Sequence, residues 1–170
     1  MVMTARTKLQ LWFGSACGNT FLVGRNNLPA FQTYLEGLRR NNQWNFDSAL
    51  FVEGNSTATT MRILEKDKTE SEMCGNGARV VGALRRFLLD EAGLVDQFAS
   101  LTILSQNGPV TVAEISPGIY RACFSSVSKI GTIPANGLPE HTLYSIGGEP
   151  HAVMVVDKLD LSAIKQTGAK

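Results

Sequence analysis

The sequence is poor in charge, in cysteine and in long apolar runs. Only 18% of its 170 residues are charged, and a net charge of +1 gives no electrostatic basis for binding nucleic acid or an acidic membrane. Its arginine pairs, Arg39–Arg40 and Arg85–Arg86, are expected on solvated helix faces. Three cysteines without paired spacing indicate neither a disulfide framework nor a metal site. No apolar run approaches the roughly eighteen residues of a membrane span, and no signal peptide is recognisable. We expect a reduced, cytoplasmic protein that spans no membrane.

The residues that are present predict one sizeable core. At 44% hydrophobic residues the chain can bury a real interior. Apolar periodicity predicts helices over 29–40 and 77–92. Strands are expected over 8–13, 21–23, 48–53, 60–64, 101–104, 110–115, 119–124, 144–146 and 152–156. This order predicts an α+β fold in which a curved, mostly antiparallel sheet packs on a central apolar helix.

The second half of the chain contains the best candidate for a linker. Residues 125–140 are polar and contain glycine and proline, which is typical of a connecting segment. Strands and a helix start near residues 159–162 follow it. We therefore expect a first domain over 1–125, and over 126–170 a linker with the incomplete opening of a second, similar domain.

A cysteine, Cys74, stands between a charged loop over 65–72 and the second predicted helix. A thiol there would face unpaired N–H groups and the positive end of the helix dipole, and both favour the thiolate. Gly75 and Gly77 would let the backbone approach a ligand closely, with N–H groups free to hold a carboxylate. The alternative is a buried structural cysteine beside a glycine-rich turn.

Three separated stretches resemble the diaminopimelate epimerase family. They are Gly18–Phe21 (Gly-Asn-Thr-Phe), Met73–Arg79 (Met-Cys-Gly-Asn-Gly-Ala-Arg) and Gly148–His151 (Gly-Glu-Pro-His). The resemblance extends over nearly the whole chain, but it covers only the family's first domain and the opening of its second. It implies two similar α+β halves with the active site between them, and an amino-acid racemase or epimerase that uses neither pyridoxal phosphate nor metal. One cysteine from each half would face the substrate α-carbon, so that one removes a proton and the other returns one to the opposite face.

The resemblance also implies roles for individual residues. Cys74 matches a catalytic cysteine. Gly75 and Asn76 match the segment whose N–H groups hold the substrate α-carboxylate. Asn19 matches a substrate-binding asparagine, which we expect at the tip of a hairpin turn over 14–20.

Where the family has other substrate-contacting residues, this chain departs from it. Ser48 replaces a glutamine, and Glu65 and Glu149 replace asparagines. If both glutamates face the cleft, they would repel a distal carboxylate, so we expect a basic substrate such as histidine, lysine or arginine, or a neutral one, over diaminopimelate. If both glutamates point to solvent, they give no reason to expect a basic or neutral substrate. No second cysteine motif is present, and Cys17 and Cys123 are expected to be core or incidental residues.

The leading interpretation is therefore an isomerase of which this chain supplies one cysteine and half of the cleft. Its ligand would be a small-molecule amino acid and its partner a C-terminal domain with the second cysteine, so the 170-residue chain alone is expected to be inactive. Exposed apolar surface in a half-formed cleft would favour a homo-oligomer. The alternatives are a non-catalytic module that binds an amino acid or a protein, a diaminopimelate epimerase proper, and an isomerase with Glu65 or Glu149 as its base.

Overall fold

The computed structural model describes residues 8–54, 58–94, 99–133 and 141–155. The chain forms two compact units, Met1–Ser126 and Val127–Lys170, which are described separately below.

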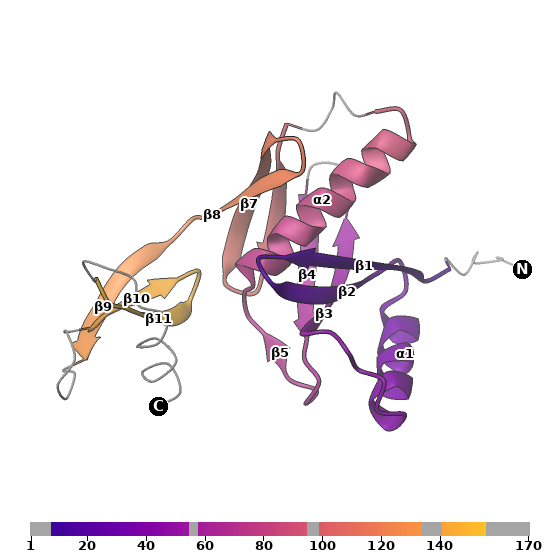
Figure 1. The fold of residues 1–170 in the computed structure, drawn as a ribbon, viewed down its shortest axis with the longest axis horizontal. Coiled ribbons are helices and arrows are strands. Elements are labelled where there is room, and N and C mark those ends of the chain that lie inside the picture. The colour runs from indigo at the N-terminus through magenta and orange to yellow at the C-terminus, as the bar shows by residue number, and fades with distance from the viewer. Residues whose placement is uncertain (1–7, 55–57, 95–98, 134–140, 156–170) are drawn as a thin grey trace, which may run out of the picture. The chain divides into compact units, whose positions relative to one another are not determined.

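The first unit is a curled sheet with one helix inside it and one outside (Figure 1). The sheet order is β1-β2-β3-β4-β6-β7-β8, and β5 pairs with β4. Neighbouring strands are antiparallel except for β2–β3 and β4–β6. The elements are β1 (Gln10–Ala16), β2 (Asn19–Arg25), α1 (Leu28–Arg40), β3 (Ser48–Gly54), β4 (Ala58–Leu64), β5 (Glu70–Ser71), α2 (Gly75–Glu91), β6 (Leu101–Ser105), β7 (Gly108–Ser116) and β8 (Ile119–Phe124). This arrangement confirms the predicted α+β fold and its mostly antiparallel sheet.

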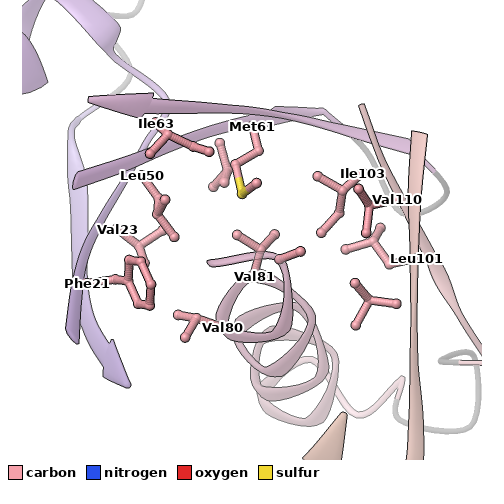
Figure 2. Close-up of a cluster of buried hydrophobic side chains, with 13 residues drawn as sticks. Phe21, Val23, Leu50, Met61, Ile63, Val80, Val81, Leu101, Ile103 and Val110 are labelled. Carbon is pink, nitrogen blue, oxygen red and sulfur yellow. The ribbon is translucent and has the colours of Figure 1, made fainter. Parts of the chain in front are cut away.

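The larger core lies between α2 and the concave face of the sheet (Figure 2). Successive strand residues point to opposite faces, so β3 contributes to both sides of the sheet. Leu50 and Val52 pack toward α2, whereas Ala49 and Phe51 pack toward α1. The inner cluster comprises Phe21, Val23, Leu50, Val52, Met61, Ile63, Ala78, Val80, Val81, Leu101, Ile103, Val110 and Val112.

Both helices begin at a side chain that caps them. Asn27 accepts a hydrogen bond from the Ala30 N–H at 3.0 Å, and Pro29 occupies the first turn, where its missing N–H costs nothing. Cys74 caps α2 in an extended conformation. The helix ends before Gly93, whose φ of 67° suits a left-handed stop.

The first hairpin differs from the prediction. Its turn is Cys17–Gly18, both with positive φ, and Asn19 already pairs with Ala16 as the first residue of β2. Asn19 is therefore not at the tip, because the strands extend further than their apolar residues do. The predicted charged loop also contains the two-residue strand β5, which pairs with the end of β4.

The second unit is a three-stranded antiparallel sheet of β9 (Val127–Ile133), β10 (His141–Ile146) and β11 (Glu149–Val153), in the order β11-β10-β9. The predicted linker was wrong over 127–133, which form β9. The turn before β11 is only Gly147–Gly148, and the predicted helix start near 159–162 lies outside the described residues. Among the described residues of this unit only Gly147 is buried, so its sheet has no hydrophobic core of its own there.

The close approach of α2 to β7 depends on a glycine. A Cβ at Gly82 would lie 2.5 Å from Cγ1 of the buried, β-branched Val112. We expect Gly82→Ala to lower the free energy of unfolding of the chain by about 1–2 kcal/mol in urea titration, because overpacking outweighs the gain in helix propensity. Gly37→Ala in α1 is the matched control, since nothing lies within 4 Å of its added Cβ. It should stabilise the chain by up to about 1 kcal/mol, and equal effects of the two variants would contradict this account of the packing.

Candidate active site

The first turn of α2 presents a thiol beside unpaired backbone donors. The Cys74 sulfur accepts the Gly77 N–H at 3.2 Å, and its side chain is half-buried. The N–H groups of Gly75 and Asn76 have no hydrogen-bond partner among the described residues. The dipole of this 17-residue helix adds partial positive charge at the same place. The turn can therefore hold an anionic group next to the sulfur.

An amide chain connects this helix start to the first hairpin. The Asn76 side chain donates to the Asn19 carbonyl oxygen at 2.7 Å, and Arg79 donates to the Asn76 carbonyl oxygen at 2.7 Å. Asn19 is fixed in turn because it opens β2. The structure thus brings Asn19, Cys74, Gly75 and Asn76 together, although Asn19 and Asn76 are 57 residues apart in the sequence.

Asp47 supports the residue next to Asn19. Its carboxylate accepts the Thr20 N–H at 2.6 Å and the Thr20 hydroxyl at 3.0 Å. These bonds, first that from the backbone and then that from the side chain, hold the pKa of Asp47 below its usual value, and the Asn19 side chain contributes in the same direction. Asp47 therefore stays ionised near neutral pH and keeps the start of β2 in place.

A second polar group surrounds Glu65. Its Oε1 accepts hydrogen bonds from the Ser71 hydroxyl at 2.7 Å and from the Ser48 hydroxyl at 3.2 Å. Its other oxygen, Oε2, accepts none from the described residues. The side chain is half-buried, so Glu65 presents an oriented carboxylate with one oxygen open to a ligand.

The two groups lie at the same edge of the sheet. In the parallel β2–β3 pair Phe21 stands opposite Ser48, so Asn19 and Ser48 are at the starts of neighbouring strands. In the antiparallel β3–β4 pair Ala49 stands opposite Leu64, which brings Glu65 next to Ser48. Glu149 belongs to the second unit, where it pairs with Ile146.

The remaining cysteines are on the surface. Cys17 is exposed in the hairpin turn, and Cys123 is exposed on β8. Neither is a core residue, so of the two expected alternatives, core or incidental, the second remains. Within the described ranges, no three His, Cys, Asp or Glu side chains gather as metal ligands would. None of the helices in those ranges is both long and apolar enough to cross a membrane.

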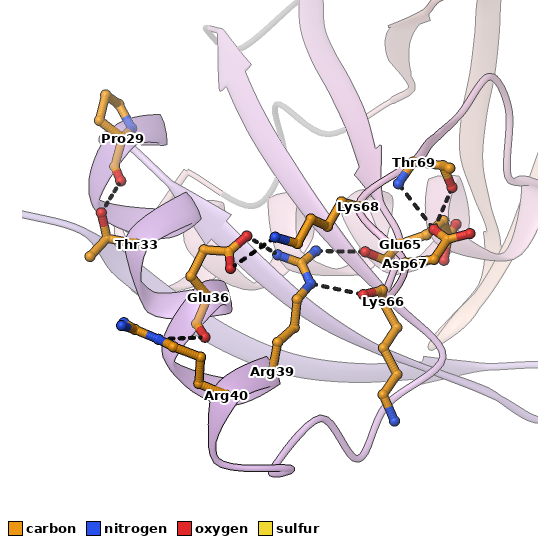
Figure 3. Close-up of polar contacts among 10 residues, drawn as sticks. All are labelled: Pro29, Thr33, Glu36, Arg39, Arg40, Glu65, Lys66, Asp67, Lys68 and Thr69. Carbon is orange, nitrogen blue, oxygen red and sulfur yellow. Dashed lines mark hydrogen bonds and ion pairs between the residues drawn. The ribbon is translucent and has the colours of Figure 1, made fainter.

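The arginine pairs do not lie simply on solvated helix faces. The Arg39 side chain is only 13% exposed and contacts the turn that carries Glu65 (Figure 3). The Nε of Arg85 is buried without a hydrogen bond, and Arg86 pairs with Glu114 at 3.6 Å. The contacts of Arg39 were therefore not predicted from the sequence, and neither were those of Ser71, Asp47 and Arg79. A signal for Arg39 was available, because it follows buried Leu35 by four residues and so shares its helix face.

Comparisons with known proteins agree with this architecture. No family model matches the chain. It is 31% identical to the diaminopimelate epimerase of Neisseria meningitidis over 150 residues, covering 73% of this chain and 50% of that protein. It is 27% identical to the diaminopimelate epimerase of Thermotoga maritima over 155 residues, covering 91% of this chain and 62% of that protein. The chain thus spans about half the length of the curated relatives it matches.

A solved structure shares the fold. A phenazine biosynthesis PhzC/PhzF protein from Clostridium difficile matches with a TM-score of 0.50 at 16% identity, over 81% of this chain and 53% of that one. At this identity the match bears on the fold alone, a curled mixed sheet with few helices. The sequence matches, at 26–31% identity, support a diaminopimelate-epimerase-like family for this chain.

Proposed function

We propose that this chain supplies one half of the active site of a cofactor-independent amino-acid racemase or epimerase. The observation that supports it most directly is the start of α2, where the Cys74 sulfur lies beside the unpaired N–H groups of Gly75 and Asn76. A base next to a carboxylate-binding turn is the arrangement that α-proton removal needs.

The chemistry needs two protonation events on opposite faces of the α-carbon. The Cys74 thiolate takes the α-proton, so that an S–H bond forms while the C–H bond breaks and its electron pair delocalises into the α-carboxylate. The N–H groups of Gly75 and Asn76 stabilise the charge that develops there. A second thiol then gives its proton to the opposite face and is left as a thiolate, which makes the reaction reversible and inverts the centre.

The second thiol has to come from outside the first unit. Both other cysteines are exposed, and among the described residues neither hydrogen-bonds with Asn19, Cys74 or Asn76. We propose that residues 1–125 form one domain, and that 126–170 open a second one whose further part carries the second cysteine. The sheet of the second unit supports this, because its described residues form no hydrophobic core and a complete second domain would supply one. Alternatively, another copy of the chain packs against this sheet.

Three free thiols favour a reducing compartment, so we propose that the protein acts in the cytoplasm.

The open oxygen of Glu65 favours a substrate with a cationic side chain. A half-buried carboxylate that is oriented by two hydroxyl groups would pair with an ammonium, guanidinium or imidazolium group and would repel a distal carboxylate. Histidine, lysine and arginine are therefore our preferred substrates. Diaminopimelate is kept as the alternative because the curated relatives are diaminopimelate epimerases.

Isotope exchange tests the proposal directly. We expect the protein with its proposed second domain, called the full-length protein below, to incorporate deuterium at the α-carbon of lysine or histidine in deuterated water. It should invert that centre without added pyridoxal phosphate. The 170-residue chain alone should give no inversion, because it lacks the second proton donor. The second candidate function is a module that binds amino acids without catalysis, and the lack of a second cysteine motif in these 170 residues favours it. Binding of these amino acids without any deuterium exchange would support this candidate.

A further inference from the structure

Arg39 connects α1 to the turn that carries Glu65 (Figure 3). Its Nη2 donates to the Glu65 carbonyl oxygen at 2.6 Å, and its Nε donates to the Lys66 carbonyl oxygen at 3.0 Å. One planar guanidinium thus holds two consecutive backbone carbonyls. A lysine could not reproduce this contact, because its ammonium group is a compact point charge without the planar fork.

Arg39 is itself held in place from two sides. Its Nη1 donates to Glu36 at 3.1 Å, and its guanidinium lies 4.7 Å from the centre of the Trp44 ring. Lys68, on the turn, lies 3.5 Å from the other oxygen of Glu36. Helix α1 is therefore connected to the turn at two points, and the mostly buried guanidinium is a rigid support.

The turn over residues 65–69 has internal hydrogen bonds, but these do not connect it to helix α1. The Glu65 N–H donates to the Thr69 carbonyl at 2.9 Å, and the Lys68 N–H donates to the Glu65 carbonyl at 3.1 Å. Asp67 accepts from both the N–H and the hydroxyl of Thr69. These bonds fix the internal shape of the turn, whereas the contacts from Arg39 connect its backbone to α1.

The orientation of this backbone decides where the Glu65 carboxylate points. The Glu65 carbonyl is in the same residue as the carboxylate that Ser48 and Ser71 hold. Without Arg39, only the bonds within the turn and the two serine hydroxyls hold that residue, so it shifts more easily, and a half-buried carboxylate gains hydration by turning outward. The site would then lose the charge that selects a cationic side chain, while Cys74 and the helix start would be unchanged.

We propose that Arg39 is a positioning residue that sets the preference of the site for cationic amino acids by holding the Glu65–Lys66 backbone. The inference rests on the proposed amino-acid site and deepens it. Nothing in it requires Arg39 to contact the substrate.

The test compares the binding of lysine and of norleucine, its analogue without the terminal amino group, to the full-length protein by calorimetry. The parent should bind lysine more tightly, and Arg39→Gln should reduce the ratio of the two dissociation constants about tenfold, the loss of one charge-assisted contact. Arg40→Gln is the matched control, because the neighbouring Arg40 donates only to a carbonyl of its own helix. Its ratio should stay within about twofold of the parent.

A double-mutant cycle separates positioning from general damage to the fold. In a Glu65→Gln background, Arg39→Gln should leave the ratio unchanged, since the charge it positions has been removed. An unchanged ratio in the single variant, or an equal reduction in both backgrounds, would overturn the inference. If the parent binds neither ligand, the proposed amino-acid site fails and this inference fails with it.

A second measurement does not depend on any ligand. In the 170-residue chain, Arg39→Lys and Arg39→Gln should speed amide hydrogen exchange at Glu65 and Lys68 about tenfold, because the turn opens more often. Arg40→Gln should leave these rates unchanged. Parent-like exchange at both amides in the Arg39 variants would show that the turn does not need Arg39.

Discussion

Replacing Cys74 by alanine in the full-length protein is expected to reduce α-deuterium incorporation about 10²–10⁴-fold, the usual contribution of a positioned general base. The reason is local. The sulfur is the group beside the N–H donors of Gly75 and Asn76, so its loss removes the base and the bond to the Gly77 N–H but keeps both donors. The rate of α-deuterium incorporation, measured by mass spectrometry, should therefore fall by this factor. The affinity for a cationic amino acid should change by less than about tenfold.

Cys17→Ala and Cys123→Ala provide the controls, because both thiols are exposed and neither accepts a hydrogen bond from the start of α2 as the Cys74 sulfur does. Either variant should exchange deuterium at the rate of the parent. The same three positions can be compared by limited iodoacetamide labelling at neutral pH. Cys74 is less exposed than the other two, so faster labelling there would have to come from thiolate character. A fully active Cys74→Ala variant would show that Cys74 is not the base. Preferential labelling of Cys17 or Cys123 would show that the start of α2 does not make the Cys74 thiol more reactive.

The elements that the sequence predicted well are those with a buried face. Phe31 and Leu35 recur at helical spacing because α1 covers one side of the sheet, and Val80 and Val81 do so because α2 fills the other. Strand β9 was missed for the opposite reason. Its residues are nearly all exposed, so no alternation of apolar and polar side chains distinguishes it from a polar connection.

The candidate site was predictable as a set of residue types but not as a set of contacts. The motif around Cys74 predicted a helix start with free N–H groups, because glycines and the following apolar spacing are local features. The hydrogen bond between Asn19 and Asn76 was not predictable, since it depends on how the hairpin packs beside α2. The support that Arg39 gives to Glu65 likewise joins two segments 26 residues apart.

The residues that support the site thus come from the tertiary contacts of short polar segments. Asp47 fixes the backbone beside Asn19, and Arg39 fixes the backbone of Glu65. Each acts on a main-chain group, and Asp47 also interacts with the side chains of Thr20 and Asn19. A sequence pattern records which side chains are present but does not record which carbonyl or N–H group they reach, so such roles emerge only from the structure.

Glu65→Asn in the full-length protein is expected to raise kcat/KM for diaminopimelate relative to lysine by about one hundredfold. Glu65 is half-buried and has one oxygen open, so a distal carboxylate next to it would meet an incompletely screened like charge, whereas an ammonium group would find a partner. Like-charge juxtaposition typically costs several kcal/mol, and each ~1.4 kcal/mol changes the ratio tenfold. Partial exposure reduces that cost, which is why we expect a factor of about one hundred and not more. Initial rates of α-deuterium incorporation with both substrates give the ratio.

Glu72→Gln is the control that separates a local charge from the net charge of the protein. It removes the same unit of charge seven residues away, on an exposed side chain whose carboxylate accepts a hydrogen bond from Asn107. The ratio for Glu72→Gln should stay within about twofold of the parent, because the charge of an exposed side chain is screened by solvent and salt. Glu149→Asn, added to Glu65→Asn, then measures whether the second glutamate acts at the same site: a further rise in the ratio would indicate that it does. A parent protein that already prefers diaminopimelate, or a Glu65→Asn variant with unchanged selectivity, would show that the carboxylate does not choose the substrate.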